Sequence, residues 1–369
     1  MNTSVSTAET TPFLNPKPYG TPTEVLIGTI YIVVILLGIP SNMVSVFYFF
    51  NQIVNQNTTK EFFKWIYANI AAVDLSMCLF SFPVVLIFYN NQRDSVLFHD
   101  SIFCKIWGFL WEFLPYYSVF LVLVLSISRM LILVRPMTVL SKKYLFLTLA
   151  LYNILLGVAK IAFYSAGITQ MDFTKRDGLC ILSFVKENTN LYPIYTFFNI
   201  ILLALPIIPI CISCVTSISK MYKTDKAIKS AGKESNNKKN YLTTQRGRLK
   251  KSKSRNRRAT ITVIIMTLTY IMCNIPVFMN YVLYGVWSAM TWTKYPPSIE
   301  TFYSNQLLYY YSWNLCLVLF VVINSALNPV IYFFRMAEFR QFVVNKCWGN
   351  IITVWISDNV LELSGGKVT

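Results

Sequence analysis

The stretch NSALNPVIY, residues 324–332, lies in the last long apolar run of the chain, which covers 309–334. Asn324, Ser325 and Asn328 are polar residues in a segment that otherwise suits lipid, so their side chains must face other protein. Pro329 has no backbone N–H to donate, which loosens a helix beside Asn328 and allows it to bend. The stretch therefore predicts a movable helix inside a membrane protein.

The other apolar residues also occur in long blocks. The chain has 369 residues, of which 55% are hydrophobic and only 13% are charged. A helix needs about 20 mostly apolar residues to cross the hydrocarbon of a bilayer. Seven such runs are present, at 25–49, 63–89, 102–127, 144–168, 194–218, 259–285 and 306–334. They predict an all-α fold, a seven-transmembrane helix bundle.

The predicted bundle divides the chain into three parts. A polar, proline-containing segment, 1–23, precedes the helical domain, 24–347, and a tail, 348–369, follows it. The first segment lacks the short apolar region before a cleavage site that a signal peptide requires. We therefore expect the first apolar run to act as the uncleaved membrane signal.

Lysine and arginine fall mainly on one side of the predicted membrane. Residues 220–258 alone contain 15 Lys and Arg residues against Asp225 and Glu234. Because short cytoplasmic loops are enriched in Lys and Arg, the distribution places the N-terminus outside. The sequence thus predicts a multi-pass protein of the plasma membrane with an extracellular N-terminus.

The third inner loop, 219–258, carries most of the formal net charge of +17. Its high charge and low hydrophobicity predict disorder. A basic run beside a membrane serves topology and attracts anionic lipid, and the same charge can also present a surface to a cytoplasmic partner. Membrane lipids are therefore expected partners, and nucleic acid is not.

Two of the eight cysteines lie on the predicted outer side. Cys104 stands at the outer start of the third run, and Cys180 lies in the loop between the fourth and fifth runs. Disulfides persist in this oxidising compartment. We expect a Cys104–Cys180 disulfide that holds the loop over the outer end of the bundle.

Two further positions are candidate modification sites. Cys347 follows an amphipathic stretch near the membrane and suits palmitoylation, with a plain free thiol as the alternative. Asn2 begins an Asn-Thr-Ser acceptor sequence for N-glycosylation if this end lies outside. An unused three-residue match is the alternative for Asn2.

Motifs at particular places in the apolar runs point together to one family. They are Gly38 to Asn42, Asn69 to Asp74, Cys104 with Arg129 twenty-five residues later, Pro206, Pro276, and NSALNPVIY at 324–332. Their order and spacing resemble the rhodopsin-like (class A) G-protein-coupled receptors over about 25–347. The resemblance implies a receptor that binds an extracellular ligand, rearranges its cytoplasmic face and activates a heterotrimeric G protein.

The resemblance also assigns roles to residues of this chain. The activation machinery and G-protein face would comprise Arg129, Pro206, Pro276, Pro329 and Tyr332. Phe339 would pack a short amphipathic eighth helix along the membrane surface, and the alternation of aromatic and basic residues around it suits an interfacial helix. The sequence offers no nucleophile paired with a base, no phosphate loop and no convincing metal cluster, so an enzyme is not expected.

A sodium pocket is the one ion site that the resemblance implies. Its residues would be Asp74, Ser118, Asn324, Ser325 and Asn328. A buried carboxylate needs a counter-ion and surrounding hydroxyl or amide groups, which fits Na⁺ bound at Asp74. The alternative is that Asp74 takes a proton or bonds only to neighbouring asparagines. No other cofactor is expected, and retinal is excluded because 309–323 contains no lysine for a Schiff base.

The chain departs from the family pattern near Arg129. Ser128 stands where an acidic residue usually restrains the arginine, Cys214 replaces a usual tyrosine, and Asn274 replaces a usual tryptophan. These departures predict either raised basal signalling or weak coupling. A signalling receptor is our first interpretation, and a receptor-like protein with weak or no G-protein coupling, silent or scavenging, is the alternative. A transporter or channel fits less well, because the polar residues gather at one site instead of forming a path.

The ligand side is less specific. Trp111 stands where amine receptors usually have an aspartate, so a simple amine is not expected. Glu112 and Lys160 lie at similar depths in the third and fourth runs and are predicted to form a buried ion pair, either fixed or in contact with ligand. The remaining candidates for contact with a peptide or small molecule, besides Trp111 and Glu112, are Asn280 and Tyr310.

Overall fold

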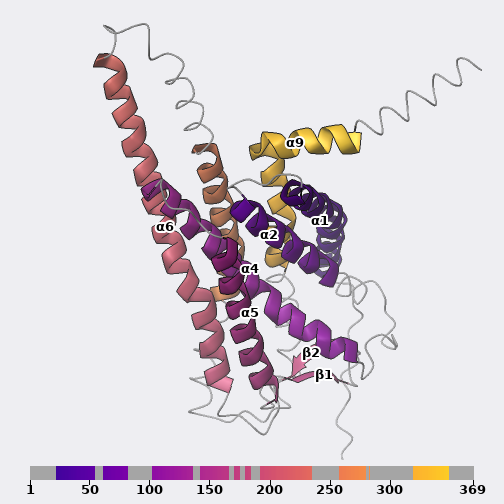
Figure 1. Cartoon of the computed structure of the whole chain (residues 1–369). Coiled ribbons are helices and arrows are strands. Elements are labelled where there is room, and N and C mark those ends of the chain that lie inside the picture. The colour runs from indigo at the N-terminus through magenta and orange to yellow at the C-terminus, as the bar shows by residue number, and fades with distance from the viewer. Residues whose placement is uncertain are drawn as a thin grey trace, which may run out of the picture.

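The computed structural model describes residues 22–54, 61–81, 102–135, 142–165, 170–174, 179–183, 192–234, 257–279, 282 and 319–348. Figure 1 shows a bundle of long helices. Its labelled helices are α1 (Pro22–Val54), α2 (Glu61–Phe80), α4 (Ile102–Val134), α5 (Lys142–Ser165), α6 (Tyr192–Glu234) and α9 (Ala337–Val343). Two further helices cover Arg257–Met279 and Leu319–Arg335, and we refer to them by these bounds.

The described helices match the predicted membrane runs. Six of them are long and apolar enough to cross a membrane, and the count is seven when the bent pair Leu319–Arg335 and Ala337–Lys346 is taken as one span. The outer part of the seventh predicted run, 306–318, lies outside the described residues. The predicted class, an all-α seven-helix bundle, is confirmed.

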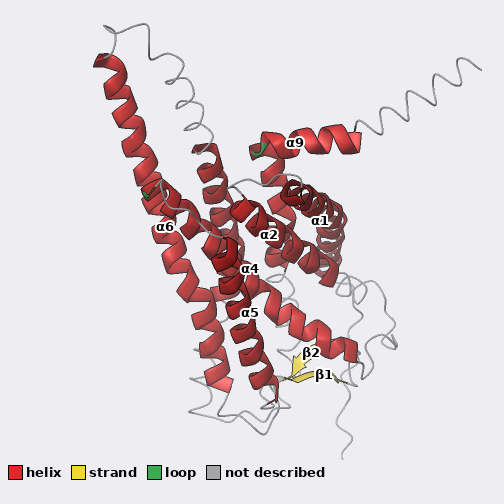
Figure 2. Cartoon of the chain, viewed as in Figure 1, coloured by secondary structure: helices red, strands yellow, loops and turns green. Residues whose placement is uncertain are grey.

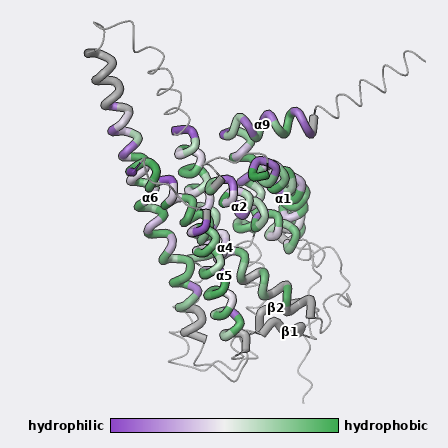
Figure 3. Tube along the Cα trace, in the orientation of Figure 1, coloured by the Kyte–Doolittle hydropathy of each residue, from purple (hydrophilic) through white to green (hydrophobic). Residues whose placement is uncertain are grey.

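Large apolar side chains face outward along the helices. Leu36, Leu155 and Val215 are 66%, 69% and 66% exposed, respectively. Figure 3 shows mainly hydrophobic residues along the coloured parts of α1, α4 and α5 and along the middle of α6. A soluble protein rarely exposes so much contiguous apolar surface, whereas lipid tails would cover it without penalty.

Two buried clusters hold the bundle together. The larger one draws residues from α1, α2, α4, α5, α9 and the helices Arg257–Met279 and Leu319–Arg335, and includes Ile66, Leu121 and Tyr332, all completely buried. The smaller one joins α4, α5, α6 and the helix Arg257–Met279 around Tyr116 and Tyr270. The two clusters place α4 at the centre of the bundle, in contact with α2, α5 and α6.

A short hairpin is a feature that the sequence analysis did not predict. Strands β1 (Gln170–Thr174) and β2 (Leu179–Ser183) pair antiparallel, with Phe173 opposite Cys180. Both strands contact α4, and Figure 2 shows them at the end of the bundle opposite α9. The hairpin therefore brings the strand that contains Cys180 to α4, the helix that contains Cys104. The described side chains include neither cysteine, so their disulfide stays a prediction.

The prediction of disorder over 219–258 is wrong for its first part. Helix α6 continues to Glu234, well beyond the membrane run 194–218. The extension contains Lys, Met and Ala, which are good helix formers, and a helix already nucleated in the membrane gains one hydrogen bond for each residue added. Residues 235–256 lie outside the described residues.

The predicted amphipathic eighth helix is present. The chain turns by 102° between Leu319–Arg335 and Ala337–Lys346, and Met336 at the turn is extended (φ −107°, ψ 102°). Phe339 is buried, and its ring centroid lies 5.1 Å from that of Tyr48 in α1. Arg340 and Gln341 are exposed on the other side, as an interfacial helix requires.

Candidate functional site

Asp74 of α2 is completely buried between helices. Its Oδ2 accepts a 2.7 Å hydrogen bond from the side-chain amide of Asn328 in the helix Leu319–Arg335. The two residues are 254 positions apart in the sequence, yet the fold pairs them directly. Two of the residues predicted for the sodium pocket are therefore brought together.

Asn42 ties α1 to the same place. Its amide donates 3.0 Å hydrogen bonds to the carbonyl oxygens of Gly38 and Ser325. A Cβ added to Gly38 would lie 2.6 Å from the sulfur of Cys78 and 3.3 Å from Cβ of Ala326. The absence of a side chain at Gly38 therefore allows α1 to approach both α2 and the helix Leu319–Arg335 closely.

Asp74 and two asparagines of neighbouring helices carry buried oxygen atoms that have no hydrogen-bond donor among the described residues. Within the described part of the chain, Oδ1 of Asn42, Asp74 and Asn324 is each buried without a partner. An unsatisfied buried acceptor costs about 1–3 kcal/mol. A cation would satisfy such oxygens, and carboxylate and amide oxygens suit a hard ion such as Na⁺. The donor set thus fits the predicted ion.

Two serines of the predicted pocket differ in their positions. Ser325 is buried, and its side chain lies next to Asp74. Ser118 is buried on α4, but among the described residues no hydrogen bond joins it to Asp74. The pocket is therefore centred on α1, α2 and the helix Leu319–Arg335.

Tyr332 ends the NSALNPVIY stretch in a cluster of aromatic rings. Its ring centroid lies 5.3 Å from Phe49, 5.7 Å from Tyr67 and 6.0 Å from Phe339, each in an edge-to-face arrangement. The Tyr332 hydroxyl is buried, and it has no hydrogen-bond partner in the described structure. Edge-to-face ring pairs stabilise this packing of Tyr332, whereas the buried hydroxyl without a partner destabilises it.

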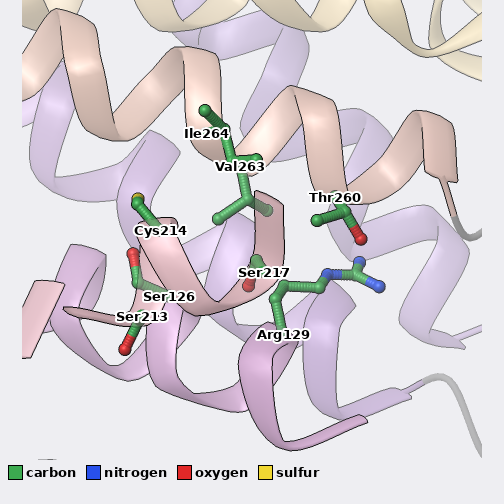
Figure 4. Close-up of a pocket in the computed structure, with 8 residues that line it drawn as sticks. All are labelled: Ser126, Arg129, Ser213, Cys214, Ser217, Thr260, Val263 and Ile264. Atoms are coloured by element: carbon green, nitrogen blue, oxygen red, sulfur yellow. The ribbon is translucent and has the colours of Figure 1, made fainter. Parts of the chain in front are cut away.

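Arg129 lies near the C-terminal end of α4 beside a small pocket (Figure 4). The pocket is lined by Ser126, Arg129, Ser213, Cys214, Ser217, Thr260, Val263 and Ile264, from α4, α6 and the helix Arg257–Met279. Its volume of about 10 Å³ is room for roughly one water molecule. Most of its exposed lining is apolar, and the guanidinium of Arg129 and the hydroxyls of Ser126, Ser213, Ser217 and Thr260 lie at its wall.

Ser126 and Thr267 connect α4 to the helix Arg257–Met279. Their hydroxyl oxygens lie 3.1 Å apart, and both residues are buried. Within the described residues no carboxylate pairs with Arg129, whose Cζ instead lies 3.6 Å from the centroid of the Phe63 ring in α2. The sequence analysis noted the missing acidic residue at Ser128, and missed both of these contacts.

The two remaining prolines of the predicted activation machinery lie inside helices. Pro206 is within α6, accompanied by Pro209, and Pro276 is near the C-terminal end of Arg257–Met279. Beside Pro276, the amide of Asn274 donates a 2.9 Å bond to the carbonyl of Tyr270. Each proline removes a backbone hydrogen bond and weakens its helix locally.

Lys160 is buried in α5 within a polar network. Its Nζ donates a 2.9 Å hydrogen bond to Oδ1 of Asn199 in α6, and the same oxygen accepts a 2.7 Å bond from the Tyr116 hydroxyl in α4. The Lys160 Nζ also lies 4.4 Å from the centroid of the Tyr116 ring. The side chain of Glu112 lies outside the described side chains, so its pairing with Lys160 stays a prediction.

Other predicted positions also lie outside what the structure describes. Asn280 and Tyr310 fall outside the described residues, as does Asn2, and the side chains of Trp111 and Cys347 are not described. Asn199 was missed by the sequence analysis, although one signal was available. It is a polar residue within the apolar run 194–218, and such a residue must face other protein.

The sequence model of the family "7 transmembrane receptor (rhodopsin family)" matches residues 41–332. Since the match covers more than half of the chain and the fold agrees, the protein belongs to this family of receptors and is a multi-pass membrane protein. A comparison with curated proteins returned no match.

Proposed function

We propose that the protein is a G-protein-coupled receptor of the plasma membrane, with its N-terminus outside. An extracellular ligand, a peptide or a small molecule, shifts the bundle so that its cytoplasmic face activates a heterotrimeric G protein. The observation that carries the proposal is the position of Arg129, which lies with four hydroxyl side chains at a small pocket shared by α4, α6 and the helix Arg257–Met279. A partner that enters there would find a guanidinium and several hydroxyls to bind.

The contacts near Arg129 would permit the inner ends of the helices to separate easily. The Ser126–Thr267 hydrogen bond is neutral, and such a bond contributes only about 1 kcal/mol to stability. Pro206 and Pro276 loosen the two helices that line the pocket with α4. The buried, unpartnered hydroxyl of Tyr332 would gain a partner by moving toward water. These features favour measurable basal signalling.

Substitution of Arg129 by alanine tests this function. We expect the parent to raise nucleotide exchange on purified G proteins above the empty-membrane level without ligand, and Arg129→Ala to lower this exchange at least about tenfold, a loss of ~1.4 kcal/mol. Arg135, exposed at the end of α4, supplies the control variant Arg135→Ala. Exchange that stays at the empty-membrane level for the parent with every G-protein class and every ligand tried would refute the proposal.

Sodium binding at Asp74 is part of the proposal, supported by the unpartnered oxygens of Asp74, Asn42 and Asn324. Na⁺ would supply a positive charge that Asp74, Asn42 and Asn324 can hold, and it would stabilise the closed packing of α1, α2 and the helix Leu319–Arg335. A ligand that binds only the folded state stabilises a protein by about 1.4 kcal/mol when the ligand concentration is ten times the dissociation constant.

Replacing Asp74 with asparagine should abolish the sodium effect. We expect the purified parent to unfold at a higher temperature in NaCl than in choline chloride at equal ionic strength, and Asp74→Asn to unfold at the same temperature in both salts. Ser76→Ala is a matched control on α2, because the Ser76 hydroxyl bonds only to the carbonyl of Ala72 in its own helix. A sodium-dependent shift that survives Asp74→Asn would contradict the assignment.

A receptor-like protein with weak coupling is the second candidate. Ser128 and Cys214 favour it, because they replace the usual acidic residue and tyrosine near Arg129. The nucleotide-exchange assay separates the candidates. A silent or scavenging receptor would bind and internalise its ligand while exchange stays at the background level in every variant.

A further inference from the structure

We propose that Phe63 of α2 takes the place of the missing acidic residue and holds Arg129 in the resting bundle through a cation–π contact. Phe63 is thus a positioning residue that acts through Arg129, and its effect on signalling rests on the proposed function. The Arg129 Cζ lies 3.6 Å from the centroid of the Phe63 ring. This is well inside the distance of about 6 Å at which a cation and an aromatic face attract each other.

The surroundings of both side chains favour this contact. Arg129 and Phe63 are each only partly exposed, and Phe63 packs against the larger buried cluster. Guanidinium groups are weakly hydrated and stack on aromatic faces more readily than ammonium groups do. A partly desolvated contact of this kind shifts an equilibrium by about 2- to 30-fold.

The hydrogen-bond donors of Arg129 support a restraint that can be released. The Nε–H of Arg129 is buried and has no acceptor among the described residues. The ring of Phe63 holds the face of the guanidinium but leaves this edge donor unsatisfied. Binding of a carbonyl or carboxylate oxygen from a cytoplasmic partner would satisfy it, which compensates for the loss of the ring contact. An ion pair with an acid would have occupied the same donors.

Fluorination of the ring tests the contact without removing the side chain. Phenylalanine carrying one, two or three fluorines is introduced at position 63 by nonsense suppression, since each fluorine weakens the negative face of the ring while its size changes little. We expect the thermal unfolding midpoint of the purified protein to fall stepwise with the number of fluorines. Basal nucleotide exchange on the G protein should rise in the same order, by about fivefold for three fluorines.

Two control series keep the test specific. Phe62 is buried next to Phe63, at a ring-centroid distance of 5.4 Å, so the same fluorinated series at position 62 reports general effects of fluorine. The fluorinated series at position 63 in an Arg129→Gln background reports the effect of fluorine on the unfolding midpoint when no cation faces the ring. We expect both control series to be flat. The inference would be overturned if fluorination at position 63 left the unfolding midpoint of the parent unchanged. It would also be overturned if the midpoint fell equally with each fluorine in the parent and in the Arg129→Gln background.

The outcome also separates this inference from the proposed function. If the unfolding midpoint follows fluorination but no variant exchanges nucleotide, Phe63 still holds Arg129 and the G-protein assignment falls. Arg129→Ala could instead lower the exchange while fluorination at position 63 changes neither the unfolding midpoint nor the exchange. In that case the G-protein assignment stands and the role of Phe63 is overturned.

Discussion

Replacing Asn199 with leucine should lower the thermal unfolding midpoint of the purified protein by roughly 5–10 °C, or about 3 kcal/mol. Oδ1 of Asn199 accepts hydrogen bonds from both Lys160 and Tyr116. Lys160 is only 3% exposed, so an ammonium that loses this oxygen cannot turn to water. Leucine has the same number of side-chain heavy atoms as asparagine and the same branching at Cγ, so the shape of the side chain is kept while its two methyl groups take more room. Retention of monodisperse protein after heating in detergent measures the effect.

Tyr116→Phe is the matched control for Asn199→Leu. It removes one hydroxyl but keeps the ring beside Lys160 and the bond between lysine and amide, so we expect a loss of about 1 kcal/mol. A midpoint for Asn199→Leu that equals that of Tyr116→Phe would mean that the amide contributes nothing to holding the buried charge.

The same network tests the predicted pair of Glu112 and Lys160. Adding Lys160→Met to Asn199→Leu removes the buried ammonium. This second change should restore stability only if no carboxylate depends on Lys160. If Glu112 pairs with Lys160, restoration requires Glu112→Gln as well, and the effects of the single changes will not add. Additive effects of Glu112→Gln and Lys160→Met would contradict the pair.

The membrane fold follows from the sequence because the lipid hydrocarbon offers no hydrogen-bond partners to the backbone. Every backbone polar group in the hydrocarbon must be paired, so a long apolar run has to be a helix. The ends of the runs obey no such rule. The 219–234 part of α6 is polar and could lie in water as helix or coil, and its helical state depends on propagation from the preceding span. Charge content alone therefore gave the wrong answer there.

Part of the site was also accessible from residue types. A carboxylate such as Asp74 and an amide such as Asn328 in lipid-facing segments must meet something polar, and in the structure they meet each other. The contact of Arg129 with Phe63 was not accessible in this way. Any exposed aromatic residue near the inner face can stack on a guanidinium, and the choice of Phe63 depends on the rotation of α2, which packing sets.

The hairpin β1–β2 and the network at Asn199 illustrate the same limit. Each strand has only five residues. An alternation of apolar and polar residues over so short a length does not identify a strand in a loop between two membrane helices. Asn199 was visible as a polar residue in an apolar run, but its partners lie 39 and 83 residues away. Long-range partners are fixed by the geometry of the bundle, which a single sequence does not specify.

Replacing Gly38 with alanine should destabilise the protein, although alanine is the better helix former. The new Cβ would lie 2.6 Å from the Cys78 sulfur. Because Cys78 is completely buried, either its sulfur must turn into closely packed surroundings or helix α1 or α2 must shift. Overpacking of this kind costs about 1–3 kcal/mol, which exceeds the gain of about 1 kcal/mol that a helix obtains from glycine to alanine. We expect a lower unfolding midpoint together with a weaker sodium effect, because Asn42 lies one turn from Gly38.

Gly157→Ala in α5 is the matched control with the opposite sign. Nothing lies within 4 Å of a Cβ built at Gly157, so the helix gains propensity without a clash and the midpoint should stay equal or rise. Adding Cys78→Ala to Gly38→Ala removes the sulfur and should recover part of the loss, with the contact to Ala326 at 3.3 Å remaining. Equal midpoints for Gly38→Ala and Gly157→Ala would mean that α1 does not depend on close approach at Gly38 to hold Asn42 against the helix Leu319–Arg335.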